Sequence, residues 1–385
     1  MAGKRKDRKG RILKTGESQR ADGTYQYRYK DCVGKYRYVY APSLEKLRKK
    51  ADVIQKDLCD GIDYAAGEAT VSELVERYAG IKRELSKNSQ RAYSTVLKYI
   101  KGCSFGQKKI RDVKKSDAKG FYVKLHDEGK KRNTIMVYHN LLNPAFELAV
   151  EDDMIRKNPF GFKLADVLPD DAEKRVALTK EQQTVYLQSE RSFQSGKFYN
   201  DIEILINTGL RVSELYGITL DDIDFSKRCV RITKQLCRTA KNPYFIKAPK
   251  TSTGIRTIPL NDTALLAFKR ALKERQAPKE EAVVDGFSNF LFLDRAGHPK
   301  VAMHLQGHMR SLQQWILKNR DADFPKVSPH SLRHTYCTNM QQAGLDVKSL
   351  QYILGHSDAS VTLNVYSHTD FSSVQSAVDR LTASF

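Results

Sequence analysis

The spacing of hydrophobic residues along the chain predicts strands first and helices afterwards. Over residues 23–30 and 35–40, tyrosines alternate with polar or basic residues. Alternation with a period of two predicts two strands, each with an aromatic face and a polar or basic face, and residues 31–34 are expected to form the hairpin turn between them. Residues 11–15 are expected to add a third strand, completing a small sheet whose basic face could enter a DNA groove.

From Ser43, hydrophobic residues recur at helical spacing up to Gly61, a typical helix stop. We expect this helix to cover the tyrosine face of the sheet and to complete a first domain, residues 1–65. The first ten residues carry many Lys and Arg side chains and are expected to be disordered until a partner binds. Residues 60–68 are expected to be a linker.

A second, all-α domain is predicted over residues 70–165. Thr70 and Glu73 have the spacing of a capping box, which marks the start of a helix. The many basic residues of this region suit a helical bundle that binds DNA. The helices are expected at residues 70–84, 88–101, 116–128 and 132–151.

The remaining chain, residues 175–385, follows an acidic linker and alternates helices with a few short strands. This pattern predicts an α+β, mostly helical domain with a small sheet at one edge. Helices are expected at 200–209, 262–275, 303–319, 330–343 and 347–354, and strands at 229–234, 244–246 and 256–260. The predicted fold class is therefore multidomain: a three-stranded sheet with a helix, an all-α bundle and an α+β domain.

Charge narrows the choice of partner. The 385 residues include 66 Lys and Arg against 45 Asp and Glu, a formal net charge of +21. The excess is concentrated at the start, because residues 1–50 hold 16 basic against 5 acidic residues. A polyanion is the expected partner, and nucleic acid is favoured over a membrane surface because the basic residues do not lie on one amphipathic helix with a broad apolar face.

The positions of the cysteines and the hydropathy of the chain argue against several other classes of protein. The six cysteines are scattered without CxxC pairs, which argues against a zinc ribbon or a disulfide framework. No run of about eighteen apolar residues is present, and no apolar core follows the N-terminal charges, so neither a membrane span nor a secretory signal is indicated. A cytoplasmic protein is expected.

Candidate chemistry is concentrated in residues 327–368. Ser328 can cap a helix and Pro329 is tolerated at its first position, so His330 and Arg333, three residues apart, are expected on one face. An imidazole beside a guanidinium suits an anion that must also exchange protons. The stretch contains His330, Arg333, His334, His356, Tyr366 and His368.

Two other segments carry isolated charges. LINTGLRVSEL, residues 205–215, places Arg211 two residues after Gly209 and Glu214 three residues further on, where its carboxylate could orient nearby donors. PKTSTGIRTIPL, residues 249–260, places Lys250 at the entrance of a tight turn between two strands. Each charge alone is typical of a solvated surface residue.

Together, in the order Arg, Lys, His-x-x-Arg, His, Tyr, these residues resemble the tyrosine recombinases, and the resemblance covers the chain from about Thr70 to its end. RKGRILKTGESQRADGTYQYRYKD near the start, with PHSLRHT and LGHSD, is similar to the integrases of conjugative transposons, the subgroup that includes the tetracycline-resistance elements. In that subgroup a small N-terminal sheet binds DNA arm sites distinct from the crossover core. The family's motif falls on Arg211, Lys250, His330, Arg333, His356 and Tyr366.

The resemblance implies an enzyme that integrates and excises a mobile element through a 3′-phosphotyrosyl intermediate. Tyr366 would attack a phosphodiester held by Arg211 and Arg333. His330 would be the base, His356 a hydrogen-bond donor to the phosphate and Lys250 the general acid for the leaving 5′ oxygen, with no metal or other cofactor. The implied partners are double-stranded DNA at core and arm sites, three further copies in a homotetrameric synaptic complex, and an excisionase or a host DNA-bending protein. The expected location is the bacterial cytoplasm, in association with the nucleoid.

Some alternatives stay open. Lys247 could replace Lys250 if the turn is longer, and spacing alone does not exclude Tyr336 or Tyr352 as the nucleophile. His334 and His368 have no assigned role. Three other classes of protein are considered: a zinc hydrolase, a non-catalytic DNA-binding regulator and a type IB topoisomerase with the same chemistry. The zinc hydrolase would use His330, His334 and His356 as ligands, but Arg333 would then lie beside the ion and repel it.

Overall fold

The chain divides into two compact units, residues 1–173 and 174–385, and its described residues form three hydrophobic cores. Two of these cores lie in the first unit and one in the second. The protein is represented by a computed structural model, which describes residues 5–31, 34–82, 87–171, 177–239, 242, 244–249, 252–276 and 278–355.

The first core lies between a three-stranded antiparallel sheet and one helix. The sheet has the order β1-β2-β3, with β1 Glu17–Gln19, β2 Tyr25–Lys30 and β3 Tyr36–Ala41, and the helix is α1, Leu44–Cys59. The tyrosines of β2 are buried with the apolar face of α1, as predicted. The predicted strand at residues 11–15 is wrong: the third strand is β1, and residues 11–13 instead pair locally with residues 5–7 around the bridge between Lys6 and Ile12.

The tyrosines of β3 do not share the buried face, and this part of the prediction is wrong. Residues directly opposite one another in an antiparallel pair point to the same side, and Tyr38 is opposite Arg28 while Tyr36 is opposite Lys30. Tyr36, Tyr38 and Tyr40 are therefore about half exposed. The guanidinium of Arg28 lies 4.7 Å from the ring centroid of Tyr36, so the open face of the sheet is both aromatic and basic.

A buried carboxylate organises the segment before β1. Asp7 accepts hydrogen bonds from the backbone N–H groups of Lys9 and Arg11 and from the Tyr25 hydroxyl. Burial opposes ionisation, but the bonds from Arg11 and Tyr25 outweigh it and lower the pKa of Asp7 to about 2. The predicted disorder of the first ten residues is therefore wrong from Arg5 onward.

The second core is a bundle of four helices, close to the predicted positions. The Thr70 hydroxyl accepts from the Glu73 N–H, and the Glu73 carboxylate accepts from the Thr70 N–H, which confirms the capping box. The helices are α2 Val71–Ile81, α3 Lys87–Gly102, α4 Lys115–Asp127 and α5 Arg132–Glu151.

The segment between the first helix and the bundle is packed. After α5, Arg156 forms ion pairs with Asp57 and Asp60 at the end of α1. The ring of Tyr64 lies 4.1 Å from the guanidinium carbon of Arg111 and meets the ring of Tyr29 edge-on. The first core and the bundle are therefore joined by direct contacts as well as by the chain.

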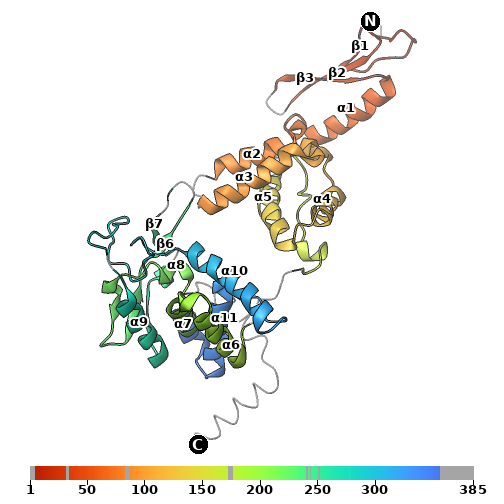
Figure 1. Ribbon diagram of the computed structural model, residues 1–385. Helices are drawn as coiled ribbons and strands as arrows, with labels where there is room; N and C mark the ends of the chain where they lie inside the picture. Colours follow the sequence, from red (N-terminus) through yellow and green to blue (C-terminus); the bar gives the residue numbers. More distant parts are fainter. Residues whose placement is uncertain are drawn as a thin grey trace, which may run out of the picture. The chain divides into compact units, whose positions relative to one another are not determined.

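The second unit is mostly helical, with short strands at one side (Figure 1). One antiparallel sheet has the order β4-β5-β8, and β6 pairs with β7 in a separate hairpin. The predicted strands on either side of Lys250 therefore belong to different sheets. The elements are α6 Lys180–Ser192, α7 Tyr199–Thr208, α8 Val212–Leu215, β4 Ile223–Asp224, β5 Cys229–Ile232, β6 Gln235–Cys237, β7 Phe245–Lys247, β8 Arg256–Pro259, α9 Asp262–Glu274, α10 Ala302–Asn319, α11 Pro329–Gln342 and α12 Val347–Leu354.

No helix within the described residues is both long and apolar enough to cross a membrane.

Candidate active site

Close packing of three helices brings two of the predicted residues together. Helix α7 ends at Gly209, which has a φ of +64°, and Arg211 follows at the N-cap of α8. A Cβ at Gly209 would lie 2.4 Å from a ring carbon of Tyr336 on α11 and 3.0 Å from a methyl carbon of Leu354 on α12. Glycine is thus required here by both backbone conformation and space, and it sets Arg211 beside α11 and α12.

Arg333 comes from α11, whose start the sequence predicted. Ser328 is the N-cap, with its hydroxyl accepting from the Ser331 N–H, and Pro329 occupies the first turn. One turn later Arg333 is buried and donates hydrogen bonds to the carbonyl oxygens of Gly209 (2.7 Å) and Leu354. The C-terminal ends of α7 and α12 thus both contact one guanidinium, with the partial negative charge of a helix C-terminus.

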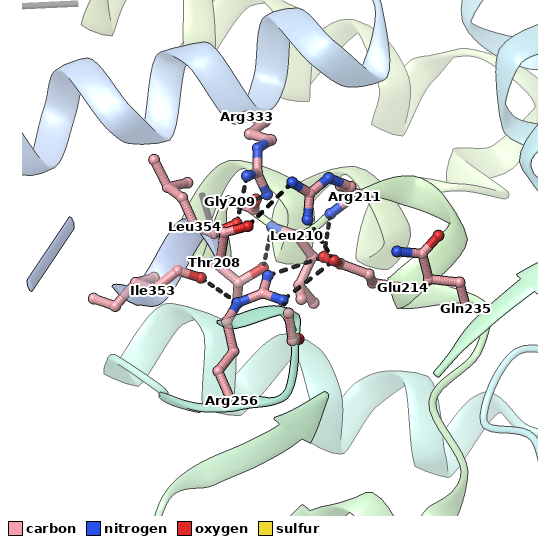
Figure 2. A network of polar contacts seen from close by, with 12 residues as sticks. Thr208, Gly209, Leu210, Arg211, Glu214, Gln235, Arg256, Arg333, Ile353 and Leu354 are labelled. Carbon is pink, nitrogen blue, oxygen red and sulfur yellow. Dashed lines mark hydrogen bonds and ion pairs between the residues drawn. The ribbon is translucent and has the colours of Figure 1, made fainter. Parts of the chain in front are cut away.

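Glu214 connects Arg211 to another arginine, Arg256 at the start of β8 (Figure 2). The Glu214 carboxylate accepts from the Arg211 backbone N–H at 2.9 Å and from its guanidinium at 2.7 Å, the orienting contact that the sequence suggested. Arg256 donates to both carboxylate oxygens, at 2.9 and 3.2 Å. Neither the Glu214 nor the Arg256 side chain is exposed to solvent, whereas Arg211 is 31% exposed.

The electrostatic balance of this cluster is positive. Burial acts to raise the pKa of Glu214, but hydrogen bonds and charge from Arg256, and then from Arg211, lower it, so the carboxylate is ionised. Burial, followed by repulsion from Arg211, lowers the pKa of Arg333 to about 9, which still leaves it cationic at neutral pH. Three guanidiniums around one carboxylate make a site for an anion.

The other predicted residues are placed as follows. His330 lies in the first turn of α11 with an exposed side chain. Lys250, His356 and Tyr366 lie outside the described residues, and the description stops at Gly355, directly before His356. The structure therefore brings Arg211 and Arg333 together, with His330 on the helix that carries Arg333.

The alternative residues have distinct environments. Tyr336 is buried on α11, and burial raises its pKa to about 12, which disfavours it as a nucleophile. Tyr352 is exposed on α12, and its hydroxyl accepts from the Thr257 N–H at 3.3 Å. Lys247 is in β7, paired with Gln235.

Arg256 is the residue that sequence reasoning missed. The predicted strand over residues 256–260 places Arg256, Ile258 and Leu260 on one face, and all three are buried. An arginine at an inward strand position implies a buried, paired charge, so the signal was present in the alternation.

The arginine cluster suits an anion such as a DNA phosphate, and comparison of the sequence identifies the class of protein, a DNA strand-exchange enzyme of the tyrosine recombinase class. Residues 169–373 match the phage integrase family, and the chain belongs to that family. Residues 70–165 match the phage integrase SAM-like domain, and residues 1–58 match the DNA-binding domain of the Tn916 integrase. Within the family, the chain stands close to the integrases of conjugative transposons.

Comparison with individual relatives supports the same family assignment. The chain is 40% identical over 395 residues to the transposase of transposon Tn1545 from Streptococcus agalactiae and to that of Tn916 from Enterococcus faecalis, covering 99% of this chain and 97% of each relative. A solved structure of the Tn1549 transposon integrase in complex with a circular intermediate DNA is 37% identical, with a TM-score of 0.76 over 81% of this chain and 99% of that one. A lambda integrase tetramer bound to a Holliday junction is 17% identical with a TM-score of 0.55, covering 91% of this chain and 95% of that one, and shares the fold.

Proposed function

We propose that this recombinase integrates and excises a conjugative transposon, with Tyr366 as its nucleophile and Arg211 and Arg333 as the clamp for the scissile phosphate. The observation that carries the proposal is that the two guanidiniums converge on the end of α12, donating to the adjacent carbonyls of Gly355 and Leu354. The segment with His356 and Tyr366 continues from there. The mobile element is assigned from the transposases of Tn916 and Tn1545, which the chain matches along almost its whole length.

The proposed chemistry is a transfer of the phosphoryl group from sugar to enzyme and back. Tyr366 passes its phenolic proton to His330 and attacks phosphorus, the bond to the 5′ oxygen breaks, and Lys250 protonates that oxygen while His356 donates to the phosphate. Attack by the 5′ hydroxyl of another strand reverses these steps and rejoins the DNA. The arginines supply the positive charge that other phosphoryl-transfer enzymes take from Mg²⁺, so no metal or nucleotide is invoked.

The proposed organisation has three functional domains: residues 1–65 for arm sites, 70–165 for core DNA and 175–385 for catalysis. Exchange between two duplexes breaks four strands and needs one tyrosine for each, so the proposed assembly is a homotetramer. An excisionase or a host DNA-bending protein is the proposed accessory partner. The proposed location is the bacterial cytoplasm, in association with the nucleoid that holds the DNA substrate. Because the N-terminal sheet adds DNA binding that relaxation alone does not need, integration is favoured over topoisomerase activity.

Trapping on a nicked duplex tests the proposal. If the nick lies just beyond the cleaved bond, the short strand with the 5′ hydroxyl diffuses away and the covalent complex accumulates. We expect mass spectrometry to find the DNA 3′ phosphate on the peptide that contains Tyr366. Attachment through Tyr336, Tyr352 or any other side chain, or to a DNA 5′ end, would contradict the assignment.

We expect deletion of residues 1–65 to remove arm-site binding and to leave core-site binding nearly intact. Arm-site affinity should fall about 100-fold or more, because the phosphate contacts of the basic sheet are lost, while core-site affinity should change by less than about fivefold. Footprinting on separate arm and core duplexes measures both.

The contacts of Arg156 with Asp57 and Asp60 make a second variant necessary, since the deletion also exposes the bundle. Arg28→Ala with Lys30→Ala changes the open face of the sheet and leaves the fold contacts in place. Lys49→Ala on α1, where the side chain is 77% exposed, is the matched control. Unchanged arm footprints in both the deletion and the double variant would refute the two-site organisation.

A further inference from the structure

Arg256 is a fully buried cation whose contacts join three segments around the candidate site. Its side chain has no exposed surface, so it cannot touch DNA directly. The guanidinium instead contacts Glu214, the carbonyl of Gly254 at 3.1 Å and the carbonyl of Ile353 at 2.5 Å. These partners come from α8, from the turn that follows Lys250 and from the end of α12.

The hydrogen bond from Arg256 to the carbonyl of Ile353 is one of three similar bonds at the end of α12. Three consecutive carbonyls at the end of that helix, those of Ile353, Leu354 and Gly355, accept hydrogen bonds from Arg256, Arg333 and Arg211 respectively. Each carbonyl thus has its own arginine. The last turn of α12 is thereby fixed at the point where the chain continues to His356.

Gly355 shows how closely the backbone approaches Arg256. Its φ is +61°, and a Cβ at this position would lie 3.0 Å from Nη1 and 3.1 Å from Cζ of the Arg256 guanidinium. The end of α12 therefore lies directly against the Arg256 side chain. A shorter or differently shaped side chain at position 256 would lose the contacts of Arg256 with this turn and with the Glu214 carboxylate.

Glu214 links Arg256 to Arg211, one of the two arginines proposed to hold the phosphate. The same carboxylate receives Arg256 on both oxygens and the Arg211 guanidinium on one, so its orientation depends on both (Figure 2). Bidentate contacts between guanidinium and carboxylate fix geometry as well as charge. Loss of Arg256 would leave the Glu214 carboxylate with its contacts to the Arg211 backbone N–H and guanidinium but without its anchor on β8, so the Arg211 side chain would be held less firmly.

We propose that Arg256 is a positioning residue of the phosphate clamp: it holds Glu214, and through it Arg211, and it fixes the end of α12 from which the His356 and Tyr366 segment continues. The inference rests on the proposed function, because it assumes that Arg211 binds the scissile phosphate. It adds a residue outside the predicted set of six.

The test compares Arg256→Gln with the native enzyme on two duplexes that differ at one atom. One carries the ordinary scissile phosphate, and the other carries a methylphosphonate there, which lacks the negative charge that the clamp binds. We expect the single-turnover cleavage rate of Arg256→Gln to fall about 100-fold on the phosphate and only about 10-fold on the methylphosphonate, where the loss of the α12 contact still acts but the loss of the clamp does not, each relative to native enzyme. Non-covalent DNA affinity should stay within about threefold.

Arg256→Lys and Arg231→Gln complete the design. Lysine keeps the charge but cannot bridge both Glu214 oxygens, so we expect an intermediate loss of about 10-fold on the phosphate. This milder variant carries the same two-substrate comparison if the glutamine variant does not fold. Arg231 is exposed on the neighbouring strand β5, opposite Thr257, and its replacement should leave both rates unchanged.

Arg211→Ala distinguishes failure of this inference from failure of the proposed function. Suppose that the rate loss caused by Arg211→Ala is smaller on the methylphosphonate than on the phosphate, whereas the rate loss caused by the Arg256 variants is the same on both. The clamp is then supported, and the positioning role of Arg256 is wrong. Equal penalties on both duplexes for Arg211→Ala would reject the clamp, and with it the role of Arg256. A rate loss that merely follows the unfolded fraction, measured by urea titration, would also reject the positioning role.

Discussion

Tyr366→Phe should abolish the covalent complex between enzyme and DNA while leaving DNA binding intact. The substitution removes the hydroxyl that attacks phosphorus and keeps the ring, so packing changes little. We expect adduct formation to fall by at least about 1,000-fold, to the background of the assay, because no other group replaces a missing nucleophile. Denaturing gel electrophoresis of reactions on the nicked duplex measures the adduct, and a mobility shift on the same duplex measures binding.

Tyr352→Phe is the matched control for this experiment. Tyr352 is exposed, and within the described residues its hydroxyl accepts one hydrogen bond, from the Thr257 N–H. Loss of this hydroxyl should therefore leave adduct formation within about twofold of native. A persistent adduct in Tyr366→Phe, or its loss in Tyr352→Phe, would show that another phenol performs the attack.

Arg211→Ala and Arg333→Ala should reduce cleavage far more than binding. Negative charge on the phosphate oxygens grows as phosphorus becomes pentacoordinate, so a guanidinium aimed at them stabilises the transition state more than the bound DNA. We expect each substitution to lower the single-turnover cleavage rate about 100- to 1,000-fold, with affinity for core DNA reduced by less than about threefold. Equal losses in rate and affinity would argue against a clamp.

The two substitutions should differ in their effect on stability. Arg333 is buried and donates to the carbonyls of Gly209 and Leu354, so Arg333→Ala removes a buried donor from two buried acceptors, at a cost of about 1–3 kcal/mol each. Arg211 is partly exposed, and Glu214 keeps Arg256, so Arg211→Ala should destabilise less. Urea unfolding separates these effects, and lysine at either position controls for charge without the planar fork.

Local signals predicted much of the fold and part of the site. The capping box at Thr70 and the start of α11 at Ser328 and Pro329 were recognisable because a cap and its partner lie within three residues. The contact between Glu214 and Arg211 depends on the same short spacing. Each of these features is decided within one turn of chain, which is why sequence alone is enough.

Features decided by pairing between distant segments were harder to predict. The alternation in β3 shows that its tyrosines share a face, but only the register with β2 determines that this face is the open one. The partner of Arg256 lies 42 residues away, so an inward arginine in the strand could be noticed but not explained. The same limit applies to β7 and β8, which are neighbours in sequence but join different sheets.

The arrangement of arginines against the ends of α7 and α12 bears on how much of the site must change when substrate arrives. Removing water from Arg256 and Arg333 is unfavourable, but in this protein that cost is part of the folding free energy, offset by Glu214 and by the helix ends. In the proposed mechanism, the phosphate therefore meets an Arg333 that is already dehydrated and an Arg211 that Glu214 and Arg256 already hold in place. These charged groups then need little rearrangement during the reaction. Fixed charges accelerate a reaction most when this reorganisation energy is small.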